Sequence, residues 1–289
     1  MNDPQWRLDG EMFRQAVRAF GRDRLPYPIR VLPLGPTETP PNADEYEAAR
    51  LAAAQRLRNM ADERLFRVLR TLLEPQVRVE VHGVYDRGFE RVVRMHAGVT
   101  GPSATLAVQA PGPTKEYGGD ILLLAIPSQQ VAARLVAYLP GCAPGRYAGV
   151  RGARSDIGKV EYARHPTRIS RTEEINRIVR RPRSGIGEIG VFAGPAVDSR
   201  PTGNPHGFHW MDYLPQDGRY LLINHSKEEF TLTPGAPQEL TRRLQHAVTT
   251  VGQSQASTPR PPASRDLSQE EIDQEDDYYR RRNERGWLT

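Results

Sequence analysis

Apolar side chains recur at helical spacing near the start of the chain. Residues 11–21 place Phe13, Ala16, Val17 and Phe20 on one stripe, and Gly21 then supplies a helix-stop signal. Residues 61–75 carry a second stripe, formed by Leu65, Val68, Leu69, Leu72 and Leu73. These two segments are therefore predicted to be amphipathic helices.

The segments around these helices have different patterns. Residues 6–8 suggest a short first strand, and the proline-rich residues 25–41 predict an extended connection. Asn42 can cap the next helix, with Glu45 reaching back to complete a capping box. That helix is expected to end near Asn59.

The hydrophobic period changes to two after residue 76. Val77, Val79 and Val81 alternate with polar residues over 77–83. Apolar segments at 89–98, 104–110 and 120–127 follow, separated by turns rich in Gly and Pro. The pattern indicates a four-stranded antiparallel meander, and residues 128–139 then predict a helix.

The second half repeats this plan. Ser170 and Glu173 form another capping box and open a helix that runs to about Arg180. Candidate strands follow at 185–194, 207–214, 218–224 and 228–234, before a helix at 236–248. In both halves the last strand ends at a proline and a helix follows. We therefore expect an α+β fold with a central, mostly antiparallel sheet, packed helices and two pseudo-equivalent halves.

The character of the chain changes near residue 250. The following residues are rich in Ser, Gln and Pro, and six acidic residues over 270–277 precede four Arg over 280–285. We expect residues 1–250 to form the folded domain. Residues 251–289 are expected to be a low-complexity, disordered charged tail, within which a short helix with internal ion pairs is an alternative.

Composition narrows the class of protein. The 289 residues carry a net charge of +5, and of the 40 basic residues only Lys115, Lys159 and Lys227 are lysine. The Arg residues are spread along the chain, which disfavours nucleic-acid binding; the densest group, at 177–183, also suits the solvated end of a helix. The longest apolar run, 121–126, cannot cross a bilayer, and the N-terminus lacks a signal-peptide pattern. We expect a cytoplasmic protein without membrane insertion.

Candidate catalytic motifs fail in their context. GIGEIG, at 185–190, matches a dinucleotide fingerprint, but no apolar strand precedes it and Pro195 excludes a helix after it. It is better read as a strand with Ile186, Glu188 and Gly190 on one face. SDIGKV, at 155–160, lacks the first glycine and the final Ser or Thr of a phosphate-binding loop.

Metal and thiol chemistry have weak support in the sequence. His206 and His209 lie three apart in a predicted strand and face opposite sides, so they cannot share a zinc ion there with Asp212 or His225. Cys142 is a single cysteine in a loop, with no neighbour that would lower its pKa. No cofactor is predicted. An enzyme with an unrecognised site near Cys142 or the histidines at 206–225 stays open as an alternative.

The order of these elements resembles the EspG family, the chaperones associated with actinobacterial type VII (ESX) secretion. The resemblance runs over about residues 5–250. It includes WRLDGEMFRQAV, the LPYPIRV segment, ADERLFRVLRTLLEPQVRVEV, GIGEIGVF, LPQDGRYLLIN and FTLTPGAPQELTRRL. The charged tail has no counterpart in this pattern.

The resemblance implies a protein that binds and does not catalyse. EspG proteins bind PE–PPE-type substrates in the cytosol at the apolar tip of the PPE helices, keep them soluble and help deliver them to the ESX machinery. In the family the loop between the second and third strands contributes, together with the central sheet and the C-terminal helical part. That loop corresponds here to Val84, Tyr85, Asp86, Arg87, Gly88 and Phe89. Because its Asp and Gly also suit a plain hairpin turn, the loop's role is a hypothesis.

Overall fold

The computed structural model describes residues 4–32, 42–159, 169–196 and 206–257. Residues up to Gln253 form one compact unit, and residues 254–289 form a second, of which only the last turn of a helix is described. Residues 258–289 of the predicted tail (251–289) and residues 33–41 of the predicted connection (25–41) lie outside the described residues.

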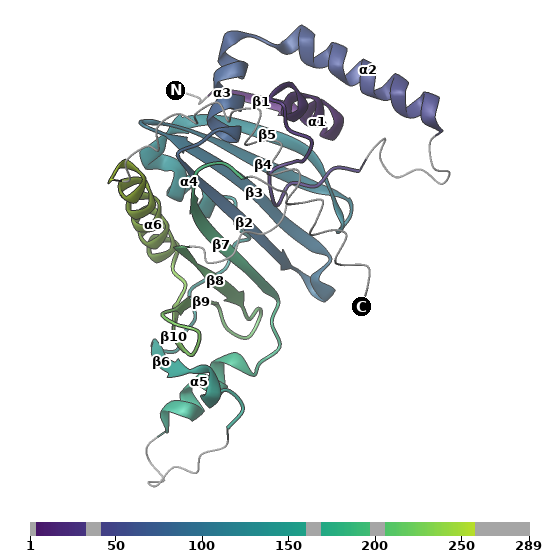
Figure 1. Ribbon diagram of the computed structural model, residues 1–289. Helices are drawn as coiled ribbons and strands as arrows, with labels where there is room; N and C mark the ends of the chain where they lie inside the picture. The colour runs from purple at the N-terminus through teal and green to yellow at the C-terminus, as the bar shows by residue number, and fades with distance from the viewer. Residues whose placement is uncertain (1–3, 33–41, 160–168, 197–205, 258–289) are drawn as a thin grey trace, which may run out of the picture. The chain divides into compact units, whose positions relative to one another are not determined.

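A single ten-stranded sheet organises the first unit, in the order β1-β5-β4-β3-β2-β7-β8-β9-β10-β6 (Figure 1). Every pairing between these strands is antiparallel. The strands of the first half are β1 (Gln5–Leu8), β2 (Val77–Tyr85), β3 (Arg91–Thr100), β4 (Ser103–Thr114) and β5 (Tyr117–Pro127). Those of the second half are β6 (Val150–Ala153), β7 (Gly185–Ala193), β8 (His206–Asp212), β9 (Arg219–Asn224) and β10 (Glu229–Pro234).

Six α-helices accompany the sheet in the described part of the chain. They are α1 (Gly10–Ala19), α2 (Ala43–Met60), α3 (Glu63–Leu73), α4 (Val131–Ala137), α5 (Arg171–Val179) and α6 (Pro237–Ser257). The capping boxes predicted at Asn42 and Ser170 are both present. Short 3-10 turns are η1 (Arg87–Phe89), η2 (Ser128–Gln130) and η3 (Arg154–Asp156).

The predicted α+β fold with two pseudo-equivalent halves is confirmed by this topology. Each half is a four-stranded meander whose last strand pairs with a short strand from earlier in that half, β1 on β5 and β6 on β10. A helix follows each meander, α4 after β5 and α6 after β10. The strand β6 was not predicted, because VRGA is short and has one strongly apolar side chain.

The two faces of the sheet are covered differently. On the first face, α4 and α6 pack on one continuous apolar core drawn from both halves. On the second face, α1, α2 and α3 share a core with β4 and β5, while α5 packs on a separate core over the outer strands of the second half. Between these two cores the central strands carry polar side chains, among them the buried Arg78, Glu80, Arg94 and His96.

The glycines of GIGEIG make room for a tryptophan. Trp210 on β8 is buried on the first face, across Gly187 of β7 and Gly83 of β2, which are paired residues. A Cβ on Gly187 would lie 2.2 Å from the indole, and one on Gly83 would lie 2.5 Å from it. The segment is therefore a sheet strand, as predicted, and its small residues permit close packing.

The last helix runs further than predicted. It continues to Ser257 instead of ending at Val248, because Val251 extends the buried stripe of Leu240, Leu244 and Val248. Tertiary packing of that stripe outweighs the low helix propensity of the Ser and Gly residues.

Replacing Gly187 by Ala is expected to lower the free energy of unfolding by about 1–3 kcal/mol, because the new methyl group must displace the Trp210 ring. Gly141→Ala is the matched control, since a Cβ there meets nothing within 4 Å. Urea unfolding of both variants measures the difference. Equal stability of the two would contradict the packing described.

Acid is expected to destabilise the fold through His96. Burial lowers the pKa of His96 to about 4, and its Nδ1 lies 2.7 Å from the Tyr27 carbonyl oxygen. Between pH 6.5 and 4 the imidazole of His96 is protonated in the unfolded chain but stays neutral in the folded chain. The free energy of unfolding therefore decreases as the pH falls, by about 3 kcal/mol in total. Unfolding curves of the wild type and His96→Gln test this, and parallel pH profiles would refute it.

Candidate functional site

The connection between β2 and β3, residues 86–90, is a tight corner. Val84 and Tyr85 belong to β2, so only Asp86, Arg87, Gly88 and Phe89 of the predicted loop lie outside the strands. The Asp86 carboxylate accepts a hydrogen bond from the Arg87 N–H at 2.8 Å, and the Asp86 carbonyl accepts one from the Phe89 N–H at 3.0 Å. The predicted strand at 89–98 therefore starts later, at Arg91.

This corner holds an unusual backbone. Asp86 (φ 74°), Gly88 (φ 73°) and Phe89 (φ 57°) all adopt positive φ, and no other described non-glycine residue does. For a bulky residue such as Phe89, that conformation costs about 1–2 kcal/mol. Phe89 is also 36 % exposed, so burial of its ring does not explain the cost. Backbone strain beside an exposed aromatic ring motivates a functional hypothesis.

A mostly apolar hollow of about 390 Å³ lies next to the corner on the first face of the sheet, with the Arg7–Asp120 ion pair at its border. Tyr85, Val93, Val108 and Leu122 belong to its floor, and Tyr138 borders it from the C-terminal end of α4. Tyr85, Val108 and Leu122 pack on the edge of the main core and remain half-buried. Neither α4 nor α6 completely covers this part of the sheet.

Three exposed large apolar side chains lie toward the same end of the sheet. Phe89 lies in the corner, Tyr138 is 41 % exposed beside the hollow, and Leu214 is 44 % exposed after β8. The Leu214 N–H donates to the Ser184 hydroxyl, and β7 starts with Gly185, the partner of Tyr85. The sequence did not single out Tyr138 or Leu214. An aromatic residue just before the LPG that ends the helix was the available signal for Tyr138.

A buried ion pair makes this end rigid. Arg219 donates to both carboxylate oxygens of Asp212 at 2.7 Å and to the Pro140 carbonyl at 2.8 Å. The pair therefore ties the segment after α4 to the β8–β9 hairpin. Removing one partner of such a buried pair typically costs about 3–5 kcal/mol.

Cys142 lies beside this pair and is a poor nucleophile. Burial, and then the charge of Asp212, raise the pKa of the thiol to about 12. The thiol is therefore protonated at neutral pH, whereas nucleophilic attack requires the thiolate. The alternative of an enzyme site at Cys142 thus has no support in its surroundings.

The histidines of the second half do not converge. His209 and His225 border one pocket on the second face, while His206 pairs with Val191 and faces the other side. His225 is engaged through Nε2 with the Thr231 hydroxyl at 2.8 Å. Within the described ranges no group of three or more His, Cys, Asp or Glu side chains is arranged to hold a metal ion.

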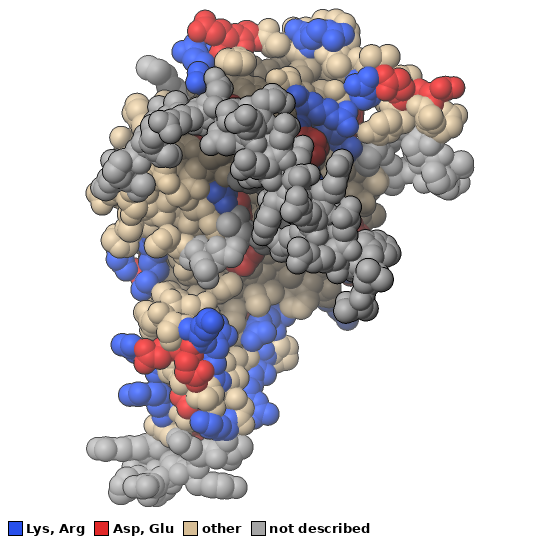
Figure 2. Space-filling model, in the orientation of Figure 1, with Lys and Arg blue, Asp and Glu red and all other residues tan. Residues whose placement is uncertain are grey.

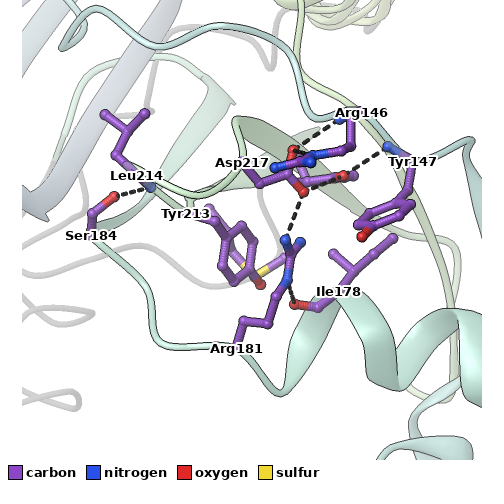
Figure 3. A network of polar contacts seen from close by, with 10 residues as sticks. Arg146, Tyr147, Ile178, Arg181, Ser184, Tyr213, Leu214 and Asp217 are labelled. Carbon is purple, nitrogen blue, oxygen red and sulfur yellow. Dashed lines mark hydrogen bonds and ion pairs between the residues drawn. The ribbon is translucent and has the colours of Figure 1, made fainter.

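The basic segment at 177–183 takes part in an internal network (Figure 3). Arg181 donates to the buried Asp217 carboxylate at 2.7 Å and stacks over Tyr213, while Arg177 stacks over Tyr147. Although burial alone raises the pKa of Asp217, hydrogen bonds from the Arg146 N–H, Arg181 and the Tyr220 hydroxyl lower it to about 2.

Figure 2 shows Lys and Arg intermingled with Asp and Glu at the end that carries β6 and α5. The basic residues at 177–183 therefore do not lie in a field of one sign. A nucleic-acid interface would favour a concentrated basic patch. The absence of nucleic-acid binding stays a prediction.

The fold is that of an α+β protein with a duplicated meander. The model of the EspG family matches residues 10–246, and the chain therefore belongs to the EspG family. This is a family of chaperones associated with ESX secretion that interact with ESX substrates, and it is not an enzyme family. A search of curated proteins gave no match.

Of the helices in the described ranges, none combines the length and the apolar character that a bilayer crossing requires.

The corner offers a direct test of stored strain. Phe89→Gly and Phe89→Ala both remove the ring, but only Gly adopts positive φ without cost. We expect the Gly variant to be more stable by about 1 kcal/mol, the reverse of the usual order. Chemical unfolding of the two variants decides, and a more stable Ala variant would show that the corner is relaxed.

Proposed function

We propose that this protein is a cytosolic chaperone that binds PE–PPE-type substrates at the apolar tip of the PPE helices. In this proposal it keeps the substrate soluble until it reaches the ESX machinery. Membership of the EspG family supports the general role. The observation that carries the finer assignment is the apolar hollow beside the strained corner at 86–90.

The chemistry of this surface suits an apolar helical tip. A partner that buries Phe89, Tyr138 and Leu214 would remove three exposed large apolar side chains from water at once. Burial of apolar area contributes about 25 cal/mol per Å². Aromatic side chains are also among the residue types most often found as binding anchors.

The rigidity of the surface also supports the proposal. The corner is fixed by its own hydrogen bonds and by an Arg91–Asp86 ion pair at 3.5 Å. The neighbouring hairpin is fixed by the Asp212–Arg219 pair. A preformed site loses little conformational entropy when it binds, so more of its contact energy appears as affinity.

Co-expression with the PE–PPE-like pair of the same organism tests the proposal. We expect a stable complex on size-exclusion chromatography, and more of the substrate pair in the soluble fraction than when it is expressed alone. Failure of every ESX substrate of that organism to form a complex would overturn the proposal.

Phe89→Ala and Tyr138→Ala are each expected to weaken the complex about tenfold or more, because a binding anchor typically contributes 2 kcal/mol or more. Leu51→Ala is the matched control, since Leu51 is 54 % exposed on α2, away from this end of the sheet. Calorimetric titration of the purified partners gives the affinities. If Leu51→Ala weakens binding as much as the other two, the interface lies elsewhere.

A further inference from the structure

The second face of the sheet contains a separate pocket of about 520 Å³. It lies over the central strands β2, β7 and β8, and the main apolar core packs on the opposite face of these strands. Glu80, Glu188 and His209 point to this side, and Tyr27 and Phe192 supply aromatic rings. The substrate-binding surface proposed above uses none of these residues.

Glu188 lies at the centre of a row of side chains that crosses four strands. His82 on β2 and His209 on β8 are its direct cross-strand neighbours, and Arg94 on β3 follows beyond His82. Neighbouring side chains in such a row lie about 5 Å apart. Burial lowers the pKa of His82 and of His209, so both rings are neutral near pH 7 and do not neutralise the carboxylate.

Glu188 has no ion pair among the described residues, and burial together with the charge of Glu188 raises the pKa of the neighbouring Tyr27 to about 12. Glu80, by contrast, is neutralised by Arg78, whose Nε lies 2.8 Å from its carboxylate. Arg78 also donates to the carbonyls of Ala193 and Gly194 and stacks over Phe192 at 4.5 Å. The half-buried Glu188 is thus the carboxylate of the pocket that a cation can still pair with.

The basic residues at the border do not supply that cation. Arg154 donates to the Asn224 side chain at 2.9 Å, and Lys227 is exposed next to Glu228 in the chain. Charges on exposed side chains are screened by water and salt, whereas a half-buried charge is screened less. The charges of Arg94 and Arg154 also act on the two histidines beside Glu188, but neither arginine forms an ion pair with its carboxylate among the described residues.

We propose that this pocket binds an arginine side chain of a partner polypeptide, with the guanidinium on Glu188 and against the ring of Tyr27. A guanidinium matches a carboxylate in a planar, two-pronged geometry and stacks on aromatic faces, as an ammonium group does less well. The pocket would then give the protein a second, polar contact on the face opposite the apolar hollow.

The probe for this pocket is N-acetyl-arginine N-methylamide, with N-acetyl-citrulline N-methylamide as its uncharged isostere. Titration is followed through the backbone amide signals of Gly190 and Gly207, which border the pocket. We expect saturable shifts with the arginine probe and about tenfold weaker binding of the citrulline probe. Equal affinity for the two probes, or no saturable shift at these glycines, would overturn the proposal.

Substitutions at Glu188 test whether its carboxylate is the group that binds the arginine probe. Glu188→Gln should weaken the arginine probe about tenfold, and Glu188→Asp should retain most of the binding. Glu63→Gln removes the same charge from an 84 % exposed side chain on α3 and should change nothing. Unchanged binding in Glu188→Gln would refute the site. If that variant does not fold, Glu188→Asp together with the citrulline comparison still decides.

Discussion

The pairing of β2 with β7 is the constraint on which the rest of the structure depends. These two strands join the meanders of the two halves along their whole length, from Val77↔Ala193 to Tyr85↔Gly185. Because side chains alternate between faces, this one register assigns the valines and Trp210 to the apolar face, and Arg78, Glu80 and Glu188 to the polar one. A shift by one residue would exchange the two sets and bury the charges in the main core.

The two faces thereby acquire different chemistry from the same strands. One face ends in an apolar hollow next to a corner whose backbone is strained, and the other holds a carboxylate among neutral rings. Membership of the EspG family makes a protein-binding role the general expectation for such surfaces. Burial and the charge of Asp212 raise the pKa of the Cys142 thiol, so this residue is a poor nucleophile.

Much of the fold follows from local patterns. The apolar stripe from Leu65 to Leu73 and the caps at Asn42 and Ser170 correctly predicted their helices. The alternation of apolar and polar residues predicted the strands of both meanders. β6 could not be found from its four residues; it could have been inferred from the duplication, which requires a counterpart of β1. For the candidate site, residues 84–89 were predicted from the resemblance to the EspG family. Tyr138 and Leu214 depend on how distant segments meet, which local patterns do not encode.

The two outermost strands have a consequence for self-association. β1 and β6, the two borders of the sheet, are each only four residues long. A long, bare border would invite a second copy to add its own strand, and so on into a fibre. Because β1 and β6 are so short, each offers few unpaired backbone groups to a strand of another copy. A protein whose family handles secretion substrates can thus carry a ten-stranded sheet without itself seeding polymerisation.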